Sequence, residues 1–375
     1  MQLELSSDQQ FFVDTTRKFL EGEAPLTTIR ELADNPDGFD RTWWRRGAEL
    51  GWTSMLVPEA DGGGSVSGHG LHDLILVAEE MGRLVSPGPF LATNVAAAAL
   101  AASGTPAQRQ EILPGIVSGD VVASWCLAEP GRPWTGSSVQ LSAASRGDGF
   151  VLNGTKTKVE AAAQADQLLV TARTDRGLTQ FLVPATTAGV RIVPLTALDL
   201  VKRFAEVHFD GVELPASAVV GEVDGAGPDV DRLLQVALVL QCAETVGAAN
   251  RVFDFTTEYA FDRFSFGRPL ASYQALKHRF ADMKLWLECC HGTTLGAAEA
   301  VESGAEDAAK LVSVAKAYVG EYATEIIQDC VQMHGGIGVT WDHDIHLYLR
   351  RATLNRALYG SPGEHRERIA ALVGM

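Results

Sequence analysis

Residues 236–253 read VALVLQCAETVGAANRVF, an apolar run that contains one carboxylate. Between Arg232 and Arg251 the only charged side chain is Glu244. The run continues a long helical pattern on both sides. A carboxylate is among the side chains that leave water least readily without a partner. The stretch therefore predicts a largely buried helix in which Glu244 has a specific task.

The chain on either side of this helix divides into three parts. Before residue 122 the pattern is helical, beginning with SSDQQFFVDTTRKFLE, where serines and an acid are suited to helix capping. From residue 123 the segments are short, β-branched and punctuated by Gly, Asn and Pro, which predicts a small antiparallel β domain. Residues 221–229 are a turn-rich linker. We therefore expect a mainly α fold with a central β domain, divided as 1–122, 123–222 and 228–375.

Composition limits the partners and the compartment. The 375 residues, 46% hydrophobic and 21% charged, are typical of a globular chain with two or three packed units. A formal charge of −16 disfavours nucleic acid and anionic membrane surfaces. The five cysteines form no C-x-x-C pair, which favours a reducing cytoplasm. No secretory leader is evident, and we expect no run of the roughly 20 apolar residues that a membrane span needs.

Standard catalytic motifs are absent from the sequence: there is no G-x-x-x-x-G-K-[ST] loop, no G-x-S-x-G elbow and no H-E-x-x-H. His343 and His346 have helical spacing, but without a third ligand we interpret them as surface or interface residues and predict no metal site. The glycines of QMHGGIG (332–338) permit close approach of a ligand to the backbone. Arg263 and Phe266 follow the long helix, and arginine beside an aromatic ring suits an adenine or pyrophosphate group.

Four stretches in this order resemble the acyl-CoA dehydrogenase family: LGWTSMLVPEADGGG with EEMGRL, WCLAEPG, YAFDRFSFGRPLASYQALKHRFADM and QMHGGIGVTWDHDIHLYLRRA. The resemblance covers nearly the whole chain. It implies an N-terminal helical domain, a middle β domain and a C-terminal four-helix bundle. It also implies a homotetramer, or a heterotetramer with a related subunit, in which a neighbouring subunit completes each site.

The resemblance implies FAD as the cofactor, an acyl-CoA as the substrate and an electron-transfer flavoprotein as the electron acceptor. The reaction would remove a proton from the carbon α to the thioester and a hydride from the β carbon, giving a trans-2-enoyl-CoA. Leu127 and Ala128 would lie along the flavin ring, with Lys158 where many relatives have a tryptophan. The remaining cofactor contacts implied are Arg263, Phe266 and Gln274 at the adenosine and pyrophosphate end, Gln332, Gly335 and Gly336 from the other subunit, and Ser361 near the ribityl chain or adenosine.

The catalytic base of the commonest relatives is missing. The sequence ALYGS places Tyr359 at the usual position of that glutamate, and a phenol is a poor base at neutral pH. The alternative position on the long helix is Ala237. Glu244 lies seven residues further along the same helix face, roughly 10 Å away. A subgroup of the family common in actinobacteria looks similar there, so we expect Glu244 to be the base, with a pKa raised by burial. The alternatives are a glutamate paired with an arginine from another helix and a glutamate facing solvent at an interface.

Three departures from the family leave other functions open: Lys158, the run EPGRPWTGSS in which Trp134 could fill part of the cleft, and Leu238 where relatives keep an arginine. A catalytically silent subunit of a mixed tetramer would account for them, and such assemblies in the subgroup often act on bulky thioesters. A flavin-dependent oxidase or monooxygenase on the same fold is a further alternative.

Overall fold

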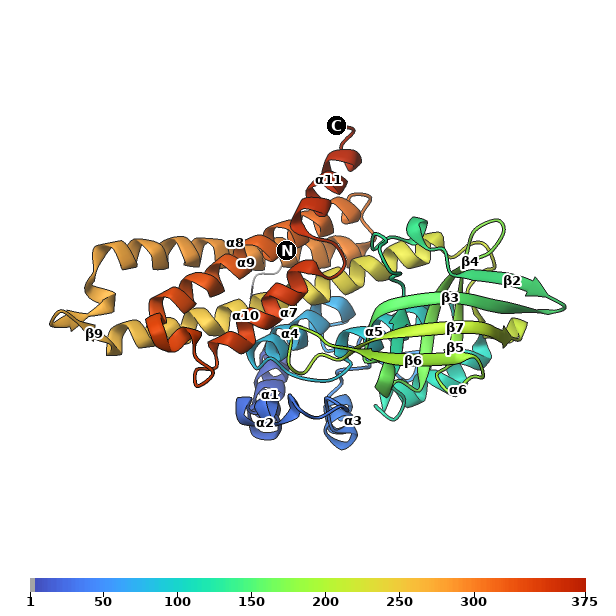
Figure 1. Ribbon diagram of the computed structural model, residues 1–375, viewed down its shortest axis with the longest axis horizontal. Helices are drawn as coiled ribbons and strands as arrows, with labels where there is room; N and C mark the ends of the chain where they lie inside the picture. The colour runs from blue at the N-terminus through green and yellow to red at the C-terminus, as the bar shows by residue number, and fades with distance from the viewer. Residues whose placement is uncertain (1–3) are drawn as a thin grey trace.

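The computed structural model describes residues 4–375 of the chain. The molecule is elongated, with a β-sheet at one end and long paired helices reaching the other (Figure 1). The first part is helical, as expected. Its elements are α1 (Ser7–Glu23), α2 (Leu26–Leu32), α3 (Arg41–Glu49), the 3₁₀ turn η1 (Glu59–Asp61), α4 (Gly70–Arg83), α5 (Phe90–Ser103) and α6 (Pro106–Val117).

Capping residues fix where the first helices begin. At α1 the Ser6 hydroxyl accepts from the Gln9 backbone N–H at 3.2 Å, while the Gln9 side chain accepts from the Ser6 N–H at 3.1 Å. Thr105 and Gln108 form the same reciprocal pair at the start of α6, where Pro106 needs no hydrogen-bond partner. The serine cap inferred from the sequence is thus confirmed.

The middle part folds into one eight-stranded sheet in the order β6-β7-β3-β2-β4-β5-β8, with β1 paired to β4. Its strands are β1 (Ala123–Cys126), β2 (Ser142–Arg146), β3 (Gly149–Glu160), β4 (Gln167–Arg173), β5 (Leu178–Pro184), β6 (Val190–Leu195), β7 (Phe204–Leu214) and β8 (Val219–Val220). The expectation of a purely antiparallel domain is wrong at two places, because β1 runs parallel to β4 and β2 pairs in parallel with the end of β4. Between β2 and β4 the chain runs back through β3, and parallel pairing needs such a connection.

The last part is again helical and is dominated by three long helices. Its elements are α7 (Gly227–Asp262), the short strands β9 (Phe264–Ser265) and β10 (Arg268–Pro269), α8 (Gln274–Ser303), α9 (Ala308–His334), the 3₁₀ turn η6 (Gly335–Val339), α10 (Ile345–Ala357) and α11 (Pro362–Leu372). The helix α7 begins at Gly227, inside the segment that the sequence assigned to a linker. Proline at the second helical position is compatible with this earlier start.

The helix α7 is the centre of the helical core. By length and composition it could cross a membrane, which corrects the expectation from the sequence, but 89% of its most apolar window is buried inside the fold. It packs against α4, α5, α8, α9 and α10. Its apolar surface is therefore used in the same way as that of the core helix of a globular protein.

The contact between α4 and α7 is unusually close because each helix presents a glycine to the backbone of the other. A Cβ atom at Gly82 would lie 1.8 Å from the carbonyl oxygen of Glu244, and one at Gly247 would lie 2.0 Å from that of Glu79. Neither space admits an alanine without movement of a helix. This contact fixes the position of Glu244 along the axis of α7 relative to α4.

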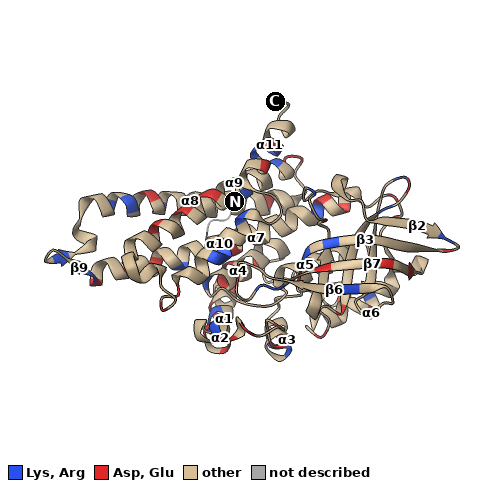
Figure 2. Cartoon of the chain, viewed as in Figure 1, with Lys and Arg blue, Asp and Glu red and all other residues tan. Residues whose placement is uncertain are grey.

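Charged side chains are dispersed over the surface rather than gathered in a tail or patch (Figure 2). The helical core and the interior of the sheet form separate hydrophobic clusters. The boundaries 1–122, 123–222 and 228–375 stay a prediction for how the chain divides into domains.

Candidate functional site

Glu244 is buried on α7, with 8% of its surface exposed, and three side chains donate to its carboxylate. Arg351 Nη1 lies 2.8 Å from Oε1, while Asn355 Nδ2 and Lys202 Nζ lie 2.7 and 3.0 Å from Oε2. Arg351 and Asn355 are one helical turn apart on α10. The arrangement matches the alternative named from the sequence, a glutamate paired with an arginine from another helix.

The partners of Glu244 belong to a larger set of buried ionisable groups, which we call the buried charge cluster: Glu160, Asp199, Lys202, Glu244 and Arg351. Asp199 accepts from the Arg351 guanidinium and from the backbone N–H groups of Val201 and Lys202. Lys202 Nζ also lies 3.5 Å from Glu160 Oε1 at the end of β3. The cluster thus joins α7, α10, the end of β3 and the segment between β6 and β7.

The two glutamates of the cluster have pKa values shifted in opposite directions. Burial alone would raise the pKa of Glu244, but the charges of Lys202 and Arg351 outweigh it and hold the pKa below 4.5. The raised pKa expected from the sequence is therefore wrong in sign. Burial raises the pKa of Glu160, and the charge of Glu244 adds to this. Three carboxyl groups face two cations, so protonation of Glu160 leaves the cluster neutral.

Both glutamates line one small cavity of about 10 Å³, together with Lys202. Its other walls come from α4, the turn before α5, α5 itself and α7, namely Met81, Ser86, Pro87, Gly88, Phe90, Leu91 and Leu240. Carboxyl groups with pKa values driven apart in one cavity are a common arrangement for proton transfer. Here Glu244 is the ionised group and Glu160 is the group more readily protonated.

Tyr359 is packed among aromatic rings next to this region. Its ring lies 4.7 Å from that of Trp134 and 6.3 Å, nearly parallel, from that of Trp125. Burial raises the pKa of the Tyr359 phenol well above 10.0, so the phenol does not act as a base at neutral pH. Trp134 packs between Tyr359 and Lys158, and its place in the substrate cleft stays a prediction.

Leu127 and Ala128 follow β1 and Lys158 lies on β3, whereas Ser361 lies at the start of α11, which packs on α9. Lys158 contacts Trp134, which contacts Tyr359 after α10, so this group lies where the sheet meets the helices. Leu127 and Ala128 are buried, and their carbonyl oxygens accept from Lys156 Nζ and from the Thr157 N–H. Lys158 is exposed, with Nζ 5.6 Å from the centre of the Trp134 ring. The Ser361 hydroxyl caps α11 by accepting from the Glu364 N–H at 3.3 Å.

Arg263, Phe266 and Gln274 lie at the far end of the long helices, at the hairpin between α7 and α8 marked by β9 in Figure 1. Phe266 is 97% exposed. Gln332, Gly335 and Gly336, at the end of α9, are also exposed, and a Cβ atom at either glycine would contact nothing within 4 Å. The side chains around the hairpin and the glycine backbone at the end of α9 are therefore exposed on the surface.

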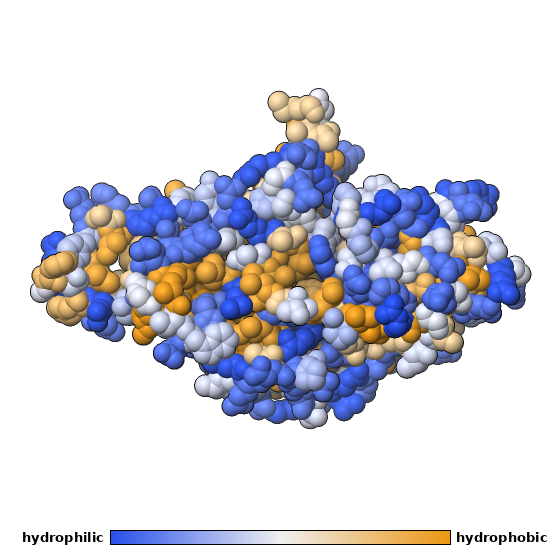
Figure 3. All heavy atoms as spheres, in the orientation of Figure 1, coloured by the Kyte–Doolittle hydropathy of each residue, from blue (hydrophilic) through white to orange (hydrophobic). Residues whose placement is uncertain are grey.

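The residues predicted to hold the cofactor therefore form two separate groups on one chain, one where the sheet meets the helices and one toward the far end of the long helices. Several exposed apolar residues accompany the far group: Phe261, Phe264, Leu285, Ile337, Val339 and Trp341. Figure 3 shows apolar atoms exposed on this face, along the helices as well as at the helical end. Exposed apolar surface on this scale is typical of a face covered by another chain.

Most of the buried charge cluster was not predicted from the sequence. Glu160 ends the strand KTKVE and has an apolar neighbour on both sides, which is a signal of burial comparable to that of Glu244. Arg351 was visible only as one of two adjacent arginines. Lys202 and Asp199 lie in a loop. No pattern indicated that Lys202 would meet Glu244 on α7 or that Asp199 would meet Arg351 on α10.

Comparison with known proteins gives consistent results along the chain. Residues 6–120, 124–212 and 230–374 match the N-terminal, middle and C-terminal domains of acyl-CoA dehydrogenases. The chain is 30% identical to acyl-CoA dehydrogenase IpdE2 of Mycolicibacterium smegmatis, over 98% of this chain and 100% of the relative.

Two solved structures share the fold over the full length of both chains. A structure of the ChsE4–ChsE5 complex from Mycobacterium tuberculosis is 28% identical with a TM-score of 0.89. One described as an electron-transferring flavoprotein of Acidaminococcus fermentans is 26% identical with a TM-score of 0.90. The chain therefore belongs to the acyl-CoA dehydrogenase family, FAD-binding oxidoreductases that act on CH–CH groups.

Proposed function

We propose that the chain takes part in the α,β-dehydrogenation of an acyl-CoA thioester to a trans-2-enoyl-CoA, within an oligomer whose subunits complete one another's sites. The separation of the predicted FAD contacts into two groups, one where the sheet meets the helices and one at the far end of the long helices, carries this proposal. We infer that a second chain brings its helical end to the first chain's remaining contacts.

The residues fit FAD at the adenosine end. Arg263 is a guanidinium available to phosphate, Phe266 is an exposed ring, and the backbone at Gly335 and Gly336 is open to close approach. At the sheet end Leu127 and Ala128 would offer an apolar wall to the flavin ring. Bound FAD supplies the hydride acceptor. The protein has to supply a base and to exclude water.

Glu244 stays our candidate for the base that takes the proton α to the thioester. Its burial and its place in the cavity shared with Glu160 support the role. Its lowered pKa keeps it ionised but makes it a weaker proton acceptor, so proton transfer would require a bound substrate to displace Lys202 or Arg351.

A matched pair of substitutions tests this assignment. Glu244→Gln should retain bound FAD and abolish bleaching of the flavin by acyl-CoA, whereas Glu160→Gln, in the same cavity, should leave bleaching in place. Circular dichroism first establishes that both variants are folded at the assay temperature. Turnover retained in Glu244→Gln would end the assignment, and turnover lost only in Glu160→Gln would transfer it to Glu160.

We also propose an electron-transfer flavoprotein as the electron acceptor and the cytoplasm as the compartment. The first proposal is supported by the similarity to the Acidaminococcus structure named for such a flavoprotein. Reduction of purified electron-transfer flavoprotein by the protein and an acyl-CoA, without oxygen, tests it. Rapid oxidation of the reduced protein by oxygen instead would favour an oxidase.

The second candidate function is that of a silent subunit in a heteromeric acyl-CoA dehydrogenase. One observation favours it: both carboxylate oxygens of Glu244 are already paired, Oε1 with Arg351 and Oε2 with Lys202 and Asn355. The similarity to a chain of the two-component ChsE4–ChsE5 complex supports it further. Stoichiometric FAD in the protein produced alone favours the first function. Flavin bound only after co-expression with a related chain favours the second.

A further inference from the structure

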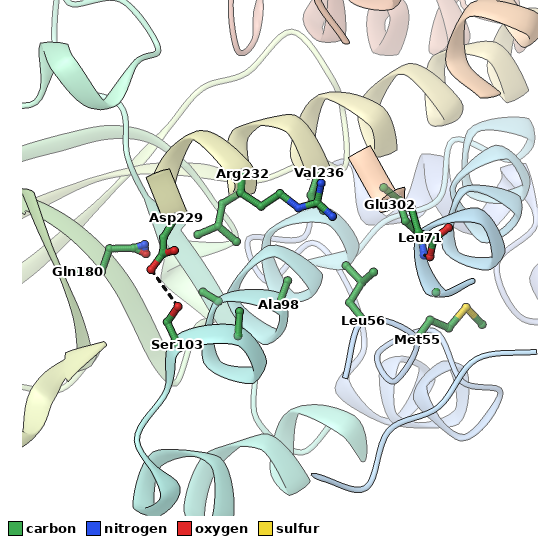
Figure 4. Close-up of a pocket in the computed structure, with 14 residues that line it drawn as sticks. Met55, Leu56, Leu71, Ala98, Ser103, Gln180, Asp229, Arg232, Val236 and Glu302 are labelled. Atoms are coloured by element: carbon green, nitrogen blue, oxygen red, sulfur yellow. Dashed lines mark hydrogen bonds between the residues drawn. The ribbon is translucent and has the colours of Figure 1, made fainter. Parts of the chain in front are cut away.

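A second cavity lies between α5, α7 and β5, at the N-terminal end of α7 (Figure 4). Its volume is about 330 Å³, at the lower end of the range for small-molecule sites. Most of the wall is apolar and much of it is alanine, which leaves room between the helices. The apolar lining consists of Met55, Leu56, Leu71, Ala98, Ala99, Ala102, Leu233 and Val236.

This cavity is separate from the one that holds Glu244. The two share no lining residue. Arg232 and Glu244 are twelve residues apart on α7, or roughly 18 Å along the helix. None of the residues predicted to contact FAD lines the second cavity. A ligand there would bind independently of the cofactor.

One end of the cavity carries an amide donor with nothing to bind. Gln180 on β5 is 2% exposed, and its Nε2 has no hydrogen-bond partner among residues 4–375. Such groups are rarely left unpaired inside a protein. Figure 4 shows Gln180 directed toward Asp229, whose Oδ2 accepts from the Ser103 hydroxyl at 2.9 Å. An amide donor beside a carboxylate acceptor suits a ligand hydroxyl, which accepts from one and donates to the other.

The other end carries a guanidinium without a carboxylate contact. Arg232 is partly buried and donates to the Val301 carbonyl oxygen, but it has no ion pair within 4.0 Å in the described part of the chain. The nearby Glu302 is already engaged, because it accepts from the Leu71 N–H at 3.0 Å and pairs with His72. In Figure 4 the Arg232 side chain extends along the cavity, away from Gln180 and Asp229.

We propose that this cavity binds a medium-chain hydroxy carboxylic acid, with its carboxylate at Arg232, its hydroxyl between Gln180 and Asp229, and its hydrocarbon body along the alanines of α5. The ligand carboxylate would accept a charge-assisted hydrogen bond from the Arg232 guanidinium. The ligand hydroxyl would accept from the unpaired Gln180 Nε2. The hydrocarbon body would be buried against the apolar wall.

Calorimetric titration with 8-hydroxyoctanoate and with octanoate tests the proposal. The wild-type protein should bind one equivalent of each per chain, with 8-hydroxyoctanoate roughly threefold to tenfold tighter because its hydroxyl makes the additional hydrogen bonds. Arg232→Gln should weaken both ligands by about tenfold or more. Gln180→Leu should remove only the difference between them. Ala98→Phe, which fills the cavity, should abolish binding of both.

Arg146→Gln, at the exposed hairpin between β2 and β3, is the matched arginine control and should bind both ligands as the wild type does. FAD content and the circular dichroism spectrum of each variant check that the fold is kept. Absence of saturable binding to the wild-type protein would overturn the proposal. Binding that survives in Ala98→Phe would also overturn it, and equal affinities of the wild type for the two acids would overturn the place given to the hydroxyl.

Discussion

Glu244 is an ionised group whose position depends on side chains from two other segments. Arg351 and Asn355 reach it from α10, and Lys202 reaches it from the segment before β7. Removal of one member of a buried ion pair leaves the other charged and poorly solvated, at roughly 3–5 kcal/mol. The carboxylate therefore contributes to the stability of the fold whether or not it also takes a proton from a substrate.

Glu244→Gln should lower the free energy of unfolding at pH 7 by roughly 3 kcal/mol, measured by urea denaturation. The pKa of Glu244 is lower in the folded protein than its ordinary value of 4.5. Its contribution is thus fully present above about pH 4.5 and is lost as the pH falls through the folded value. The difference between wild type and variant should be constant from pH 7 to about pH 5 and should shrink below that.

The control for this measurement is Glu213→Gln, which removes a carboxylate from an ion pair with Arg146 in which both side chains are about two-thirds exposed. It should change stability by about 1 kcal/mol or less, because solvent screens such pairs. A loss in Glu244→Gln no larger than in Glu213→Gln would contradict the structural role of Glu244.

Part of this site was predictable from the sequence. The burial of Glu244 followed from the apolar run around it, and pairing with an arginine of another helix was one of three outcomes considered. The identity of that arginine was not predictable, because Arg351 is 107 residues further along the chain. The sign of the pKa shift depends on those partners, so it could not be inferred from burial alone.

The helices α4 and α7 form the closest helix pair around the site, through Gly82 and Gly247. Each glycine admits the backbone of the facing helix and leaves no volume for a methyl group. Helix type and order were predictable here from periodicity and capping residues. The close approach of α4 and α7 was not predictable, because a glycine inside a helical pattern does not indicate which backbone it faces.

Gly82→Ala and Gly247→Ala should each destabilise the protein by roughly 1–3 kcal/mol or more, because the added methyl group forces the two helices apart. Thermal unfolding measures the change. Gly292→Ala on α8 is the control, since a Cβ atom there meets nothing within 4 Å. It should be neutral or stabilising by up to about 1 kcal/mol, because alanine favours helix over glycine. Equal behaviour of the three variants would contradict the close contact.

The whole molecule is elongated, and its predicted FAD contacts form two groups, one where the sheet meets the helices and one at the far end of the long helices. The order of a helical part, a sheet and a second helical part was predictable from changes in residue pattern along the chain. The separation of Leu127 and Ala128 from Arg263, Phe266 and Gln274 was not. The family resemblance assigned these residues to one subunit, whereas the fold separates them and places the second set at the far end of the long helices.

Subunit complementation tests this arrangement. A chain with Arg263→Ala and Phe266→Ala and a chain with Ala128→Trp should each bind little FAD. Co-expression of the two should restore part of the FAD content, since a mixed oligomer has one site in which both contributing ends are intact. Absorbance of the purified protein at flavin wavelengths measures the content. A mixture as colourless as either parent would contradict a shared site.

The five groups of the buried charge cluster also constrain how this chain can diverge from its relatives. Loss of Asp199 leaves Glu244 as the remaining carboxylate partner of Arg351, and loss of Lys202 leaves Glu160 and Glu244 facing each other. Each single replacement is unfavourable, whereas a joint replacement by uncharged residues of similar volume can be neutral. Descendants of this protein should therefore keep the set intact or exchange several of its members together, and in an alignment these five positions should covary.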